Sequence, residues 1–93
     1  MIGKQVLVRT YSAGVHFGQL EAKEGKEVTL SSARRIWSWQ GAKTLSEIAT
    51  SGLDVKNSRV SVPVSAIVLT EAIEIIEISP EAQAVLESAQ WSK

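Results

Sequence analysis

Alternating apolar and polar residues dominate the first third of the chain and predict a β-meander. Residues 4–10 and 15–21 both read as strands, because their apolar members alternate with polar ones and several are β-branched. Gly14 lies in the short connection between them and can take the positive φ angle that a hairpin turn commonly needs. Gly25 lies between charged residues in a second turn, and residues 27–32 return as a third strand. The pattern therefore predicts three consecutive antiparallel strands.

Continued strand alternation over residues 33–40 predicts a basic and aromatic stripe. Side chains of successive strand residues point to opposite faces of a sheet. One face would carry Arg35, Trp37 and Trp39, and the other face would carry Arg34, Ile36 and Ser38.

The hydrophobic period changes after Gly41 and predicts a helix inserted in the segment 41–58. Thr44 and Glu47 have the spacing of a capping box, and an apolar edge follows them. Gly52 supplies the stop signal. A short helix is therefore expected between Thr44 and Gly52.

The second half of the chain carries the strongest β pattern. Residues 60–64 alternate, with Pro63 confining that piece to a sheet edge. Residues 66–78 form an apolar segment in which Ile75 and Ile76 stand side by side, which predicts a bulge or a strand that crosses between two sides of a barrel.

A C-terminal helix is predicted over residues 80–89, because Ser79 and Pro80 match an N-cap followed by proline at the first helical position. Five strands and two helices fit one domain over residues 1–93. The expected fold is mainly β (α+β), a strongly bent five-stranded antiparallel barrel of the Sm-like or SH3-like kind with an inserted and a C-terminal helix.

Composition narrows the chemistry. The chain has 93 residues, 44% hydrophobic and 22% charged, and no apolar run approaches the roughly 18 residues that a membrane span needs. The N-terminus lacks the continuous apolar stretch of a secretory signal, so a cytoplasmic protein is expected. Without cysteine, disulfides and thiolate metal sites are excluded.

Charge is distributed unevenly although the net charge is zero. Residues 1–43 carry seven Lys or Arg against three Glu, and residues 44–93 carry three against seven acids. The N-terminal half therefore attracts anions. The same asymmetry is equally compatible with two surfaces that attract each other within the monomer or between subunits.

Two segments resemble the Sm-like fold. GVHFGQLEAKEGKEVTLSSARRI resembles its first half and IVLTEAIEIIEI its second half, and the resemblance covers roughly residues 4–30 and 66–78. It implies rings built by pairing of edge strands, with RNA bound by many members at the inner face.

The whole chain also resembles a family of short phage and prophage proteins of unassigned function. The motifs VRTYSAGVHFG, GKEVTL, ARRIW and LTEAIEII and the helix after LSEIA carry this resemblance. It implies expression in the cytoplasm of a bacterial host and supplies no catalytic residue.

Known catalytic motifs are missing from the sequence. No P-loop, G-x-G-x-x-G, H-E-x-x-H or nucleophile elbow occurs. One histidine excludes a multi-histidine metal site within one chain. We therefore expect no enzyme, no metal and no cofactor, with a metal-free nucleotide-degrading reaction through His16 left open.

The remaining pattern favours binding of a nucleotide-type anion. Guanidinium groups pair with phosphate, and indole or phenol rings stack on bases. The predicted ligand-binding residues are Arg34, Arg35, Trp37, Trp39, Tyr11, Ser12 and His16. The pattern leaves open which arginine faces the site, and whether each tryptophan belongs to the core, to a subunit interface or to the ligand.

The predicted function is a homo-oligomeric phage protein that sequesters a nucleotide-type small molecule, such as a host immune signal, without transforming it. Such a protein, called a sponge, would keep the signal away from the defence effector of the host, which would stay inactive. Two alternatives remain. A ring that binds single-stranded nucleic acid would use the same Arg and Trp residues, and a structural or adaptor protein of the phage would need the tryptophans only for subunit contact. The zero net charge argues against the first alternative.

Overall fold

Six strands and two short helices make up the protein in the computed structural model, which describes residues 1–90. The strands and helices, in chain order, are β1 (Gln5–Thr10), β2 (Val15–Glu24), β3 (Glu27–Ser38), α1 (Leu45–Ser51), β4 (Arg59–Val60), β5 (Val64–Leu69), β6 (Ala72–Glu77) and α2 (Pro80–Glu87).

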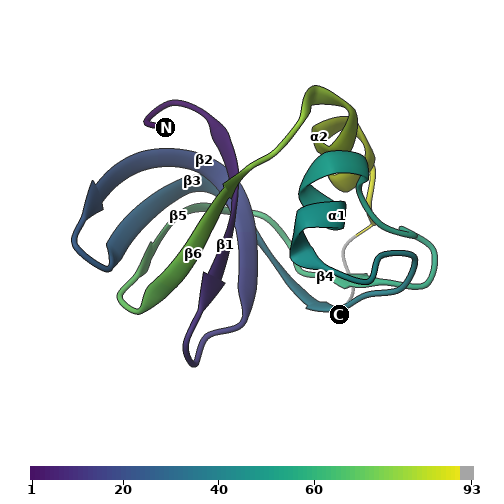
Figure 1. The fold of residues 1–93 in the computed structure, drawn as a ribbon, viewed down its shortest axis with the longest axis horizontal. Helices are drawn as coiled ribbons and strands as arrows, with labels where there is room; N and C mark the ends of the chain where they lie inside the picture. The colour runs from purple at the N-terminus through teal and green to yellow at the C-terminus, as the bar shows by residue number, and fades with distance from the viewer. Residues whose placement is uncertain (91–93) are drawn as a thin grey trace.

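The strands form one antiparallel sheet that is bent but not closed (Figure 1). The strand order is β4, β3, β2, β1, β6. β5 pairs with residues 28–33 of β3, whereas β4 pairs with the C-terminal end of β3. The prediction of a mainly β fold with two helices is confirmed. The sheet has six strands rather than five, because a connector strand of two residues precedes β5, and a closed barrel is not observed.

Two hydrophobic cores lie on opposite sides of the sheet. In β1, Val6 and Val8 pack into one core and Leu7 into the other, so this strand is buried on both faces. In β6, Ile75 packs against the core that contains Val6 and Val8, and Ile76 packs against the core that contains Leu7. Of the two predicted explanations, a bulge between these residues is wrong, because Ile75 and Ile76 pair with Val8 and Leu7 without a register shift. The other explanation fits in part, since β6 contributes to the cores on both sides of the sheet. The register of β6 against β1 instead shifts where Arg9 and Thr10 pair with residues 74 and 72.

The antiparallel pairing of β2 and β3 is irregular near Gly18. Ser32 adopts φ 49°, and the register shifts opposite Gly18. A Cβ atom on Gly18 would lie 2.8 Å from the carbonyl oxygen of Ser31, so only glycine lets the two backbones approach this closely. The curved sheet encloses the core that contains Val6 and Val8.

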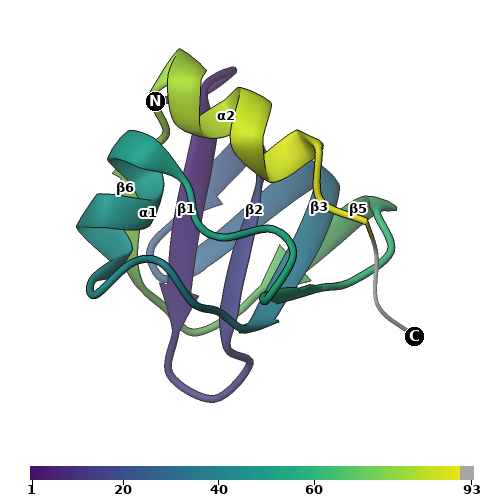
Figure 2. The ribbon, with the colours of Figure 1, turned by 90° about the vertical axis from the view of Figure 1, so that its right-hand side faces the viewer.

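Both helices cover the same side of the sheet (Figures 1 and 2). The Thr44 side chain caps α1 by accepting a hydrogen bond from the Glu47 amide at 3.2 Å. Ser79 accepts from the Ala82 amide at 3.0 Å and donates to the carbonyl of Thr50 at 2.7 Å, which ties α2 to the end of α1. Both predicted N-caps are confirmed. Within residues 1–90 no helix is long and apolar enough to cross a membrane.

Candidate functional site

The predicted ligand-binding residues separate into four places in the fold, three cavities and the exposed surface at Trp37. His16, Arg34 and Arg35 line one cavity, Trp39 lines a second, and Tyr11 lines a third. The predicted stripe is therefore divided. The reason is a register shift between β3 and β4, where Ile36 pairs with Val60 and Ser38 pairs with Arg59. Trp37 is the extra residue of this irregularity, which breaks strict alternation before Trp39.

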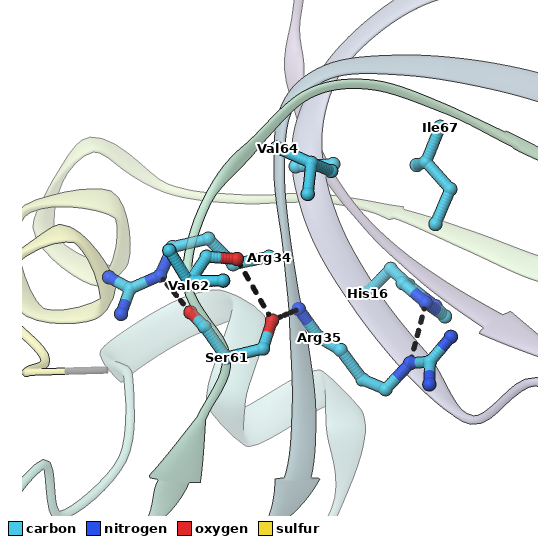
Figure 3. Close-up of a pocket in the computed structure, with 8 residues that line it drawn as sticks. His16, Arg34, Arg35, Ser61, Val62, Val64 and Ile67 are labelled. Carbon is cyan, nitrogen blue, oxygen red and sulfur yellow. Dashed lines mark hydrogen bonds between the residues drawn. The ribbon is translucent and has the colours of Figure 1, made fainter. Parts of the chain in front are cut away.

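His16 and Arg35 form a hydrogen-bonded pair beside a cavity of about 220 Å³ (Figure 3). They are direct partners across β2 and β3, and the Arg35 Nε donates to the His16 Nε2 at 3.0 Å. Only 1% of the surface of His16 is exposed, while Arg35 is exposed. The Ser61 hydroxyl accepts from the Arg35 amide at 2.8 Å and anchors the connector to β5 at this point.

The His16 imidazole is neutral in this setting. Burial, and secondarily the charge of Arg35, lowers the pKa of His16 to about 4. Because Nε2 accepts the hydrogen bond from Arg35, the imidazole proton resides on Nδ1. This Nδ1 is buried and has no hydrogen-bond partner among the described residues. A buried donor without a partner is uncommon in folded proteins.

Arg34 leaves β3 in the opposite direction from Arg35 (Figure 3). Its guanidinium lies 6.0 Å from the centre of the Phe17 ring, and its Nε donates to the carbonyl of Ser61 at 2.8 Å. Only 8% of Arg34 is exposed, and burial lowers its pKa. One Nη of Arg34 is buried without a partner in the described part of the chain. These contacts favour a packing role for Arg34, so Arg35 is the arginine that is available to a ligand.

Replacing Arg34 with methionine is expected to change the free energy of unfolding by no more than about 1 kcal/mol. The lost hydrogen bond to Ser61 is offset because a buried guanidinium with an unsatisfied Nη is replaced by an apolar side chain of similar length. Urea unfolding measures this difference. A loss above about 3 kcal/mol would contradict the packing role and show that the charge itself stabilises the fold.

Trp37 is the most exposed tryptophan of the described residues, with 54% of its surface exposed. The Arg59 guanidinium carbon lies 6.0 Å from the centre of its ring, within the range of a cation–π interaction. Trp37 does not line the cavity next to His16. It therefore forms a separate surface feature of β3 and β4.

Trp39 forms part of the wall of a larger cavity of about 450 Å³. It is half-buried and packs against the core that contains Leu7 and the buried residues of both helices. Arg9 of β1 and Lys43 of the loop before α1 supply two cations. The remaining lining residues are Val15, Thr44, Leu45, Ser46 and Glu74. This cavity combines an aromatic ring with two positive charges.

The loop that carries Trp39 is fixed by the segment after α1. The Gln40 amide donates to the Ser58 hydroxyl at 3.0 Å, and the Asp54 amide donates to the Gln40 carbonyl at 2.9 Å. Gly41 adopts φ +84°, and a Cβ there would lie 2.9 Å from the Asp54 amide nitrogen. Trp39 is therefore held in place before any ligand arrives.

Tyr11 and Ser12 lie at the tip of the β1–β2 turn. Tyr11 is 78% exposed and lines a small cavity with Lys26, Glu71 and Ile73. The Ser12 hydroxyl donates to the Glu71 carboxylate at 2.6 Å. Neither residue lines the cavity of Arg35 or that of Trp39.

Comparison with known families gives a relationship for nearly the whole chain. Residues 3–86 match the model of a family described as a domain of unknown function, DUF6948. The chain belongs to the DUF6948 family. No curated protein and no solved structure matches it.

Two cations of this DUF6948 domain were not predicted as site residues. Arg9 and Lys43 are 34 positions apart in the sequence and meet at the Trp39 cavity only because α1 packs beside β1 and β6. The excess of basic residues in the first 43 positions was the only signal that pointed toward them. Within residues 1–90 no group of three or more acidic or histidine side chains is placed to hold a metal ion.

Proposed function

We propose that this protein binds a nucleotide-type anion, without transforming it, in the Trp39 cavity. The observation that carries the proposal is the half-buried Trp39 ring in one wall of a 450 Å³ cavity that also contains Arg9 and Lys43. A nucleotide needs a flat surface for its base and positive charge for its phosphate. This cavity supplies both from residues of the same chain.

Stacking on Trp39 would contribute the larger share of affinity. A base stacked on an aromatic side chain is worth about 1–3 kcal/mol, and the fixed loop reduces the entropy lost on binding. The core behind Trp39 prevents its ring from turning away.

Arg9 and Lys43 would bind the phosphate. Both side chains are exposed, so they reach a ligand at the mouth of the cavity without losing a buried contact. Glu74 pairs with Arg9 in the register of β1 and β6 and lines the same cavity, which leaves one net positive charge in the lining. This charge balance favours a ligand with one or two negative charges over a long polyanion.

The biological form of the proposal is sequestration. The resemblance to short phage and prophage proteins motivates a sponge in the host cytoplasm that removes a nucleotide immune signal as a homo-oligomer. The His16–Arg35 pair is separate from this cavity and is not required for it.

Thermal-shift and tryptophan-fluorescence titrations with mononucleotides, cyclic dinucleotides and ADP-ribose derivatives test the proposal. We expect one class to raise the melting temperature and to quench fluorescence. In Trp39→Leu and in the double variant Arg9→Gln/Lys43→Gln, affinity should fall at least about tenfold, which corresponds to about 1.4 kcal/mol. Trp37→Leu and Lys26→Gln are matched controls that should bind as the wild type does.

The same experiment separates the alternatives. Affinity that rises with strand length and falls steeply with salt would identify a single-stranded nucleic-acid binder. No shift with any nucleotide would leave a structural or adaptor role and contradict the proposal. Mass analysis of the bound ligand should return it intact, since a cleaved ligand would indicate an enzyme.

A further inference from the structure

The cavity beside His16 differs in chemistry from the Trp39 cavity. Its wall is largely aliphatic, formed by Ala33, Val62, Val64 and Ile67, and its volume of about 220 Å³ is half as large. Ala33 is buried in the core enclosed by the curved sheet, and Ile67 packs against that core. The cavity therefore lies beside this core and can hold a small apolar group.

The polar side of this cavity is positively charged and already oriented. The Arg35 Nε is held by the His16 Nε2, which fixes the plane of the guanidinium and leaves its two Nη groups unused by any hydrogen bond to described residues. Two parallel Nη–H groups match the two oxygens of a carboxylate. The Ser61 hydroxyl is occupied by the Arg35 amide and the Val62 carbonyl.

His16 holds Arg35 from a buried position. The residue is 99% buried, and its Nδ1, which carries the proton, has no hydrogen-bond partner in residues 1–90. Because Nδ1 has almost no accessible surface, it does not open into the cavity, and His16 acts on the site through the hydrogen bond that orients Arg35.

We propose that this cavity is a second binding site, for a carboxylate attached to a small aliphatic group. Arg35 binds the carboxylate, the aliphatic part lies against Val62, Val64 and Ile67, and His16 orients Arg35. The site is independent of the nucleotide site. His16 and Val15 are consecutive in β2, so their side chains face opposite sides of the sheet, and Val15 lines the Trp39 cavity.

Methyl NMR on the full chain tests this site with hexanoate and with hexanamide, which has the same length and no charge. Hexanoate should shift the methyl signals of Val62, Val64 and Ile67 in a saturable manner. Hexanamide should bind at least about tenfold more weakly, because it cannot form the charge-assisted pair. Equal binding of both ligands, or no shift with hexanoate, would overturn the proposal.

Variants locate the binding and distinguish it from the nucleotide site. Arg35→Gln should weaken hexanoate at least about tenfold, whereas Arg59→Gln, an exposed arginine outside the cavity, should not. Val62→Phe should also weaken hexanoate, because Val62 is exposed and its enlargement narrows the cavity without loading the core. Unchanged hexanoate affinity in folded Arg35→Gln or Val62→Phe would contradict the site. Nucleotide titration of the same variants should be unaffected, so each proposal can fail separately.

The carboxylate has two natural sources, a free short-chain acid and the C-terminal residue of a peptide. A tripeptide that ends in leucine, with a free or an amidated C-terminus, separates them. Stronger shifts with the free-carboxylate peptide than with hexanoate would assign the site to peptide termini, and the reverse would assign it to free acids. Both results keep the carboxylate at Arg35.

Discussion

Replacing Gly52 with alanine is expected to lower the free energy of unfolding by about 3–5 kcal/mol. Gly52 ends α1 with φ 86° and ψ −158°, a region that L-residues other than glycine rarely occupy. A Cβ there would lie 2.6 Å from the Cγ1 of Val85 and 2.7 Å from its Cβ. Because Val85 belongs to α2, relief requires the two helices to separate. Urea unfolding measures the loss.

Two further variants divide this loss into its causes. Gly25→Ala meets nothing within 4 Å and has φ +60°, so it should cost only about 1 kcal/mol. The double variant Gly52→Ala/Val85→Ala should recover only the part of the loss that comes from the two Cγ atoms of Val85, because the Cβ of residue 85 stays 2.7 Å from the added Cβ. A Gly52→Ala variant as stable as Gly25→Ala would show that the helices do not pack as described.

Acid is expected to destabilise the protein through His16. The pKa of His16 is near 6.5 when unfolded and about 4 in the fold, because of burial and then the charge of Arg35. Between these values the unfolded chain binds a proton that the folded chain does not. The stabilisation is therefore complete above about pH 6.5 and is lost as the pH falls toward about 4. The linkage predicts a loss of about 2 kcal/mol between roughly pH 7 and pH 4.5.

His16→Gln isolates this contribution, because the amide oxygen can still accept from the Arg35 Nε but does not titrate. Chemical unfolding at a series of pH values should show a shallower slope for the variant between about pH 6.5 and pH 4.5. Carboxylates titrate in both proteins and cancel in the comparison. Equal slopes would contradict the buried, neutral state of His16.

The local elements of this fold were predictable because each has a short-range cause. Gly14 and Gly25 take positive φ angles in turns, at +83° and +60°, as the turn chemistry required. Thr44 and Ser79 cap the two helices through bonds to residues three positions ahead. None of these features needs a distant partner.

The arrangement of the candidate sites was only partly predictable. Alternation correctly separated Arg34 from Arg35, but it could not decide which arginine would be covered, since this depends on Phe17 and Ser61. The same alternation placed Trp39 beside Arg35. It missed the irregularity at Trp37, which arises from pairing with a two-residue strand 22 positions later.

By itself, the sequence determined the first three strands and their turns, the starts of both helices and the mainly β character of the fold, and it showed the excess of basic residues in the first half, because these follow from neighbours in the chain. Only the tertiary structure decided that the sheet stays open, that β1 and β6 serve two cores, and that Arg9 and Lys43 meet at Trp39 while Arg35 pairs with His16. Cavities and buried polar pairs form between segments remote in the chain, and their geometry follows from sheet register and helix packing, which no local pattern specifies.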